Sequence, residues 1–331
     1  MAERFKEAFF RTAIHGLVTD PFLSLHVRRS ALIEDSLNQL QSRHIDLKKK
    51  LRIEFFNEDG VDAGGLTKEW FLLLVRDLFD PQYGMFTFDE DSALCWFNTV
   101  SFENNEEYRL VGIVIGLAIY NSTILDVHFP LACYKKLLGH PVDLEDLKSL
   151  RPVLGRGLQQ LLDYDADDVE AVFCRDFVAE YDAWGEIVRV PLVPNGHQIP
   201  VTKDNKKEFV DRYVNWLLNE SIEKQFNAFK EGFYHVCGGN APEEIEMMVR
   251  GGTELDIRSL ESVTEYEGFN ASEPIIRQFW EVANEYSTDM KRKLLLFITG
   301  TDRIPATGIQ NMAFKISYLG EVRFNEGVDV P

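Results

Sequence analysis

The sequence is poor in the residues that mark secreted or metal-binding proteins. Its 331 residues include only four cysteines, and no two of them form a CxxC pair. The seven histidines show no HExxH or other metal-ligand spacing. So few cysteines are typical of a reducing compartment. We therefore expect a cytoplasmic or nuclear protein with no metal site and no cofactor.

Basic residues and long apolar runs are scarce as well. There are 35 Lys and Arg residues against 54 Asp and Glu residues, which gives a formal net charge of −19. This balance argues against binding to nucleic acid or to an anionic membrane surface, and it permits attraction of a basic partner. The first ten residues, MAERFKEAFF, lack the apolar run of a secretory signal. The most apolar stretch, 111–120, is far shorter than the roughly 20 residues that span a membrane.

Two glycines in that apolar stretch, Gly112 and Gly116, have the GxxxG spacing. The spacing allows two helices to approach closely, either in a membrane or in a protein core. Because the stretch is too short to span a bilayer, we predict close packing of a buried helix.

The length fits about two domains, and helical patterns predominate. The periodicity predicts an α+β fold with one large lobe and a small remnant after a turn-rich hinge, TEYEGFNASEP, at 264–274. An acidic connector, DYDADD, is expected at the surface over 163–168.

We expect helices from Asp20-Pro21, from Leu66, over 106–137 with a break near 121–122, from about 204 as one long helix, and over 274–286 and 288–298. Strands are expected over 48–56 and 314–318, and a hairpin over 186–202 with its turn at Asn195-Gly196.

Two short motifs are weighed against simpler interpretations. The segment GVDAGGLTK has Leu66 where a phosphate-binding loop needs Lys, so its glycines are assigned to a tight turn before a helix. His235 and Cys237 are close enough in sequence for a base and a nucleophile. They follow a helical pattern, however, and a simple helix end is the favoured interpretation.

Leucines 154, 158 and 161 recur at i, i+4 and i+7 after Pro152. Such a stripe usually faces a protein core. If the stripe were exposed, each leucine would contribute about 1.5–3 kcal/mol on burial against a partner. Spacing alone leaves both interpretations open.

Seven segments, in order along the chain, resemble the HECT family of ubiquitin ligases. They include LRIEFFNEDGVDAGGLTKEWF at 51–71, YRLVGIVIGLAIYNSTILDVHFP at 108–130 and NGHQIPVTKDNKKEFVDRYV at 195–214. The others are IEKQFNAFKEGFYHV, TEYEGF, PIIRQFWEVANEY and LLLFITGTDRIPATGI. Together they cover nearly the whole chain.

The resemblance implies a bilobal HECT fold with a large, mostly helical N-lobe that contains β-hairpins. The N-lobe is expected over 1–266, with a conjugating-enzyme-binding sublobe at about 145–250, and the hinge and partial C-lobe over 267–331. The family's N-lobe recruits a ubiquitin-conjugating enzyme, and a C-lobe cysteine takes ubiquitin as a thioester and passes it to a substrate lysine. The apolar lining of the family's conjugating-enzyme groove matches Leu154, Leu158, Leu161, Phe209 and Tyr213.

The match departs from the family pattern near the C-terminus. After FKISYLG the family continues into a His-Thr-Cys-Phe-like element with the catalytic cysteine, whereas this chain reads EVRFNEGVDVP and ends at Pro331. We therefore expect a C-lobe truncated before that cysteine, and no catalytic residue among the four cysteines present. The leading hypothesis is a HECT-type ubiquitin-protein transferase whose chain is incomplete. The alternative is a non-catalytic module that binds ubiquitin-conjugating enzymes.

Overall fold

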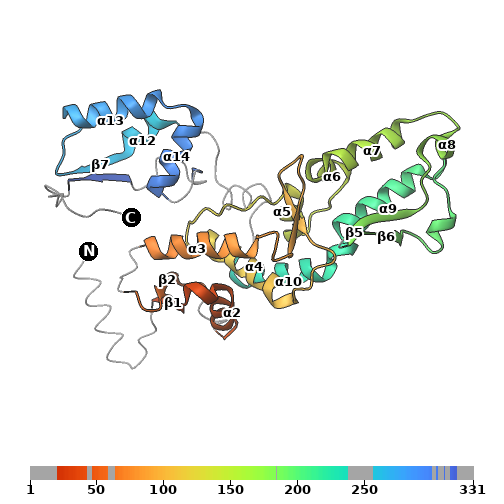
Figure 1. Cartoon of the computed structure of the whole chain (residues 1–331), viewed down its shortest axis with the longest axis horizontal. Coiled ribbons are helices and arrows are strands. Elements are labelled where there is room, and N and C mark those ends of the chain that lie inside the picture. The colour runs from red at the N-terminus through yellow and green to blue at the C-terminus, as the bar shows by residue number, and fades with distance from the viewer. Residues whose placement is uncertain are drawn as a thin grey trace, which may run out of the picture. The chain divides into compact units, whose positions relative to one another are not determined.

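The computed structural model describes residues 21–42, 47–58, 64–183, 185–237, 256–299, 303–304, 309 and 314–318. The chain divides into two compact units, Met1–Val249 and Arg250–Pro331. Both units combine helices with two-stranded sheets, so the predicted α+β class is confirmed (Figure 1). Within the described residues, no helix has the length and apolar character needed to cross a membrane.

The first described element is a strand, β1 (Phe22–Val27), which pairs in parallel with β2 (Lys50–Phe55). The prediction of a helix starting at Asp20-Pro21 is therefore wrong from Phe22 onward, while Asp20 itself lies outside the described residues. Leu23, Leu25 and Val27 are fully buried and alternate with more exposed residues. This period of two is the pattern of a strand, and β2 confirms the strand predicted over 48–56.

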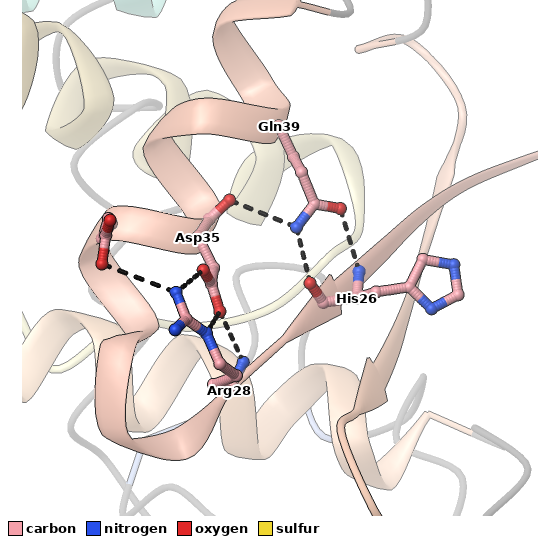
Figure 2. A network of polar contacts seen from close by, with 5 residues as sticks. His26, Arg28, Asp35 and Gln39 are labelled. Atoms are coloured by element: carbon pink, nitrogen blue, oxygen red, sulfur yellow. Dashed lines mark hydrogen bonds and ion pairs between the residues drawn. The ribbon is translucent and has the colours of Figure 1, made fainter.

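Side chains of α2 (Leu32–Ser42) cover the outer edge of β1, as Figure 2 shows. Gln39 accepts a hydrogen bond from the backbone N–H of His26 at 3.0 Å and donates one to its carbonyl oxygen at 2.5 Å. Asp35 accepts from the backbone N–H of Arg28 at 2.8 Å and from its guanidinium at 2.6 Å. Hydrogen bonding to Arg28 lowers the pKa of Asp35. The backbone groups at the end of β1 that these side chains bind are therefore not available for pairing with another strand.

The core of the first unit is rich in aromatic side chains. It is formed by α3 (Gly65–Leu78), β3 (Phe86–Phe88), β4 (Cys95–Phe97), α4 (Asn105–Tyr120) and α10 (Glu223–Val236). The ring of Phe97 stacks on Phe129 at 5.6 Å and meets Phe226 and Phe229 edge-on at 5.4 and 5.3 Å. These contacts join β4 to α10 across more than 120 residues of sequence.

Helices α4 and α10 lie side by side (Figure 1) and cross at glycines. A Cβ atom on Gly112 would lie 2.0 Å from the carbonyl oxygen of Phe229, and one on Gly232 would lie 2.0 Å from that of Arg109. A Cβ atom on Gly116 would lie 2.7 Å from the Cβ of Val236. The predicted close packing of a buried helix at this GxxxG motif is confirmed.

The middle of the chain forms an arm that extends from this core (Figure 1). Its helices are α5 (Leu131–Leu137), α6 (Leu144–Leu150), α7 (Pro152–Asp163), α8 (Val169–Phe173) and α9 (Lys206–Leu218), and its strands are β5 (Val178–Ala183) and β6 (Glu186–Pro191). The sublobe predicted over about 145–250 overlaps the arm, but α10 within that range packs against α4. The predicted break near 121–122 is confirmed, because α4 ends at Tyr120.

The hairpin predicted over 186–202 is misplaced. Strand β6 pairs with the upstream strand β5, and Gly185, at φ 88°, lies in the turn between them. Asn195, at φ 59°, instead precedes the 3-10 helix η2 (Gly196–Gln198). Gly196 packs against Phe177, since a Cβ there would lie 2.3 Å from the Phe177 carbonyl oxygen. The Asn-Gly pair therefore serves a tertiary contact.

The single long helix expected from about 204 is instead two helices, α9 and α10, separated by the 3-10 helix η3 (Glu220–Ile222).

The second unit contains α12 (Ile257–Val263), β7 (Thr264–Glu267), α13 (Pro274–Glu285), α14 (Thr288–Thr299) and β8 (Phe314–Ser317). The two late helices and the strand at 314–318 confirm the prediction. Ile257 and Leu260 pack with Ile276 and Trp280, and β7 pairs in parallel with β8. Residues before 266 thus belong to this unit, and the division at 249/250 differs from the predicted boundary at 266/267.

Candidate functional site

The leucine stripe predicted to bind a partner lies on α7, which starts with Pro152 at its first position. Gly155 lets α7 approach α6, because a Cβ there would lie 2.6 Å from the Cα of Lys148. The side chains of Leu158 and Leu161 are 6% and 2% exposed, whereas Leu154 is only partly buried. Most of the stripe therefore faces the interior of the arm.

The two aromatic residues of the predicted groove lie on α9 and are buried as well. Phe209 is 2% exposed and meets Phe177 edge-on at 5.5 Å and Tyr213 at 5.8 Å. Tyr213 is 8% exposed, and its burial raises the pKa of its hydroxyl. Trp216, on the same helix, stacks on Tyr181 of β5 at 5.9 Å. This ladder of rings holds the hairpin against α9.

The structure thus brings the five predicted residues into one apolar cluster between α7 and α9. Four of them are buried there. The exposed apolar residues of the arm are others: Val153 is 62% exposed, Val172 52% and Ile187 65%. Spacing could not identify these three, because each lies next to a partly buried apolar residue in a helix or strand of mixed pattern.

The acidic connector between α7 and α8 is exposed, as predicted, and is held by two lysines. Lys206 donates to the carbonyl oxygens of Leu162 and Tyr164, both at 2.7 Å, and so satisfies groups at the C-terminal end of α7. Lys203 pairs with Asp167 at 2.8 Å, and this hydrogen bond lowers the pKa of Asp167. The connector presents carboxylates beside the exposed apolar residues of α8.

A hollow of about 420 Å³ lies between the β3–β4 turn and the start of α7. Asp89 shapes the turn by accepting from the backbone N–H groups of Asp91 and Ser92 at 3.1 and 3.0 Å. The indole N–H of Trp96 is buried without a hydrogen-bond partner among the described residues. The hollow is lined by residues 87–91, Leu94, Trp96, Leu150, Arg151 and Val153, and this lining includes the three acidic residues at 89–91. Sequence reasoning missed it because its two walls are about 60 residues apart in the chain.

Three of the four cysteines are buried or partly buried, and the fourth is exposed. Cys95 and Cys133 are buried, and burial raises the pKa of Cys133 well above its ordinary value. Burial also raises the pKa of Cys237, whose Sγ donates to the Gly116 carbonyl oxygen at 3.3 Å. The exposed Cys174 donates to the Ala171 carbonyl oxygen at 3.2 Å. In the described part of the chain, no three His, Cys, Asp or Glu side chains form a group that could hold a metal ion.

Comparison with known proteins identifies the family. The family model described as "HECT-domain (ubiquitin-transferase)" matches residues 72–324. The chain is 46% identical over 308 residues to the probable E3 ubiquitin-protein ligase HERC4 of Homo sapiens. This match covers 91% of this chain and 29% of that protein. It is 45% identical over 315 residues to the probable E3 ubiquitin-protein ligase HECTD2 of Mus musculus, covering 89% of this chain and 41% of that protein.

A fungal relative gives the same result. The chain is 43% identical over 335 residues to the probable E3 ubiquitin-protein ligase HUL4 of Eremothecium gossypii, covering 95% of this chain and 40% of that protein. The chain therefore spans well under half the length of these relatives. The family model covers most of the chain and extends over both compact units. The chain belongs to the HECT-domain family of ubiquitin transferases.

Proposed function

We propose that this chain is the HECT part of a ubiquitin-protein transferase, which takes ubiquitin from a conjugating enzyme as a cysteine thioester and transfers it to substrate lysines. The observation that carries the proposal is the family match over residues 72–324, together with relatives named as probable E3 ubiquitin-protein ligases. The first unit corresponds to the N-lobe and the second to the C-lobe. The four free cysteines agree with a cytoplasmic or nuclear location.

The arm is the proposed docking surface for the ubiquitin-conjugating enzyme. Its exposed apolar residues Val172 and Ile187 would contact the partner, and the carboxylates of the connector would attract a basic surface. Leu158, Leu161, Phe209 and Tyr213 act beneath this surface by fixing α7 against α9, and Leu154 has some exposed area of its own. We expect a transient interface below about 1,200 Å².

Binding is tested by titration calorimetry with a ubiquitin-conjugating enzyme. Ile187→Ala should weaken binding about tenfold, because a buried isoleucine contributes about 1.5 kcal/mol more than alanine. Ile275→Ala is the matched control, since Ile275 is 61% exposed in the second unit and Ile187 is 65% exposed in the first. Unchanged affinity for Ile187→Ala and for Val172→Ala would refute the assignment. Phe209→Ala is a poor probe, because it removes two ring contacts of the arm.

The chemical step is tested separately on a nonreducing gel. Burial raises the pKa of Cys133 and Cys237, and the resemblance assigns none of the four cysteines to the family's catalytic position. We therefore expect that this chain, mixed with ubiquitin-charged conjugating enzyme, binds it without forming a reductant-sensitive ubiquitin adduct. An adduct on any of the four cysteines would contradict this expectation. Binding without an adduct is also the behaviour of a non-catalytic binding module. A longer protein that contains this chain and forms the adduct would distinguish the transferase from that alternative.

A further inference from the structure

The pair Asn195-Gly196, which resembles a hairpin turn in sequence, places a chemically reactive amide in an exposed loop. Asparagine followed by glycine is especially prone to deamidation, because glycine has no side chain to shield its backbone nitrogen from the asparagine amide. No other asparagine in the sequence is followed by glycine. Asn195 is exposed, and its side chain makes no capping hydrogen bond to η2. Contacts of its side chain therefore do not explain how this amide would be kept intact.

Deamidation of this pair is an intramolecular reaction that needs no other reactant than water. The backbone nitrogen of Gly196 attacks the side-chain carbonyl carbon of Asn195, a C–N bond forms, and the bond to the side-chain nitrogen breaks. That nitrogen leaves as ammonia and takes with it the proton lost from the Gly196 N–H. Water then opens the resulting five-membered succinimide at either of its two carbonyl carbons, which yields aspartate or isoaspartate at position 195.

The backbone conformation of the loop opposes this attack in two ways. Ring closure requires the Gly196 nitrogen to lie nearly eclipsed with the Asn195 Cβ about the Cα–C bond of Asn195. In the left-handed conformation of Asn195, at φ 59° and ψ 25°, these two atoms lie far apart around that bond. In addition, the Gly196 N–H donates to the Val193 carbonyl oxygen at 2.9 Å, which holds the attacking nitrogen in place.

The loop is anchored in this conformation by the residue before β5. The backbone N–H of Phe177 is shared between the carbonyl oxygens of Gly196 and Ile199, at 3.1 and 3.0 Å. Gly196 is buried at this contact, where a Cβ would lie 2.3 Å from the Phe177 carbonyl oxygen. Rotation about ψ of Asn195 turns the peptide unit that leads to Gly196. The reactive geometry is therefore reached only when Gly196 moves away from Phe177.

We propose that Asn195 is a deamidation site controlled by the fold, which reacts only after the loop over 192–199 opens locally and frees Gly196 from Phe177. While the loop is closed, its backbone geometry keeps the exposed amide intact. Once isoaspartate forms, its extra backbone methylene displaces Gly196, so the loop cannot regain its contacts with Phe177. The ring of Phe177 meets Phe209 edge-on in the arm at 5.5 Å. A rare opening of the loop is thereby converted into a permanent loss of packing at the open end of the β5–β6 hairpin.

The test compares the folded full chain with the same chain unfolded in urea, at about pH 7.5 and in otherwise identical buffer. Samples taken over time are cleaved briefly with trypsin at mildly acidic pH, where deamidation is slow. Mass spectrometry of the fragment 190–203, which contains no other asparagine, measures the mass increase, and chromatography separates the aspartate and isoaspartate products. We expect the folded chain to deamidate at least about tenfold more slowly, because only the open fraction of the loop reacts. Equal rates in the folded and the unfolded chain would overturn the proposal.

A variant tests whether the contacts of the loop control the reaction. Ile199 is partly buried against the core of the first unit. Loss of its packing in Ile199→Ala should raise the open fraction of the loop, so the folded variant should deamidate about fivefold faster than the unmodified chain. Ile275→Ala, which removes an isoleucine that is 61% exposed in the second unit, should leave the rate within about twofold.

Circular dichroism verifies that both variants fold. An unchanged deamidation rate in folded Ile199→Ala would also overturn the proposal. If that variant fails to fold, the comparison between the folded and the unfolded form of the unmodified chain decides.

Discussion

Replacement of Gly112 by alanine is the sharpest test of how the first unit holds together. The new Cβ would lie 2.0 Å from the carbonyl oxygen of Phe229, 2.7 Å from the backbone nitrogen of Phe233 and 3.0 Å from the carbonyl carbon of Phe229. All three atoms belong to the backbone of α10, so no side-chain rotation can relieve the contact. The helices would have to separate until the shortest distance approaches about 3.5 Å.

The magnitude follows from two opposing effects. Alanine in a helix interior is favoured over glycine by about 0.5–1 kcal/mol. Overpacking of a core costs about 1–3 kcal/mol and sometimes more, and a backbone clash as short as this belongs at the upper end. We therefore expect Gly112→Ala to lower the free energy of unfolding by about 2 kcal/mol or more. Separation of α4 from α10 would also loosen Phe229, which packs on Phe97.

Gly157 provides the matched control. It lies within α7, and a Cβ there would have no atom within 4 Å. Gly157→Ala should therefore raise the free energy of unfolding by about 0.5–1 kcal/mol. Urea titration followed by circular dichroism measures both changes. If the two substitutions shift the midpoint in the same direction, the close crossing of α4 and α10 is not what stabilises the unit.

Two further substitutions test buried charges. Glu107→Gln should raise the stability at pH 7.5 by about 1 kcal/mol, because burial raises the pKa of the Glu107 carboxyl and one of its oxygens is buried without a partner among the described residues. The raised pKa means that the Glu107 carboxyl binds its proton more tightly in the folded state than in the unfolded state, so the wild type loses stability as pH rises through the raised pKa. The stability advantage of the glutamine should therefore vanish below about pH 4.5. A stability gain that does not depend on pH would contradict this reasoning. Asp146→Ala should lower the free energy of unfolding by about 2–3 kcal/mol, since Asp146 pairs with Lys135 and completes a capping box with Asp143. Lys135→Met, which leaves the capping box intact, should lower the free energy of unfolding clearly less when the two variants are compared by thermal denaturation. Equal losses of stability would argue against a contribution from the cap.

Local patterns were sufficient for some elements of the fold. Strand β2, helices α13 and α14 and the glycine crossing of α4 follow from periodicity and spacing within a single segment. Strand β1 was mistaken for a helix because Pro21 is a common first residue of helices, and its parallel partner β2 lies more than 20 residues away. The Asn195-Gly196 pair similarly resembles a hairpin turn, but it serves a contact with Phe177. Both errors arise where a distant segment decides the conformation.

The candidate site could be predicted only in part, for a related reason. A stripe such as Leu154, Leu158 and Leu161 has the same spacing whether it lines a groove or a core, because spacing identifies a helix face and not what covers that face. The structure shows that Leu158 and Leu161 are buried in the arm, where α7 contacts both α6 and α9. The proposed partner of the arm would therefore contact mainly residues outside the stripe, with Leu154 as the one partly exposed leucine of the three. This is why the binding prediction now rests on exposed residues such as Ile187, for which a substitution can weaken binding without unfolding the arm.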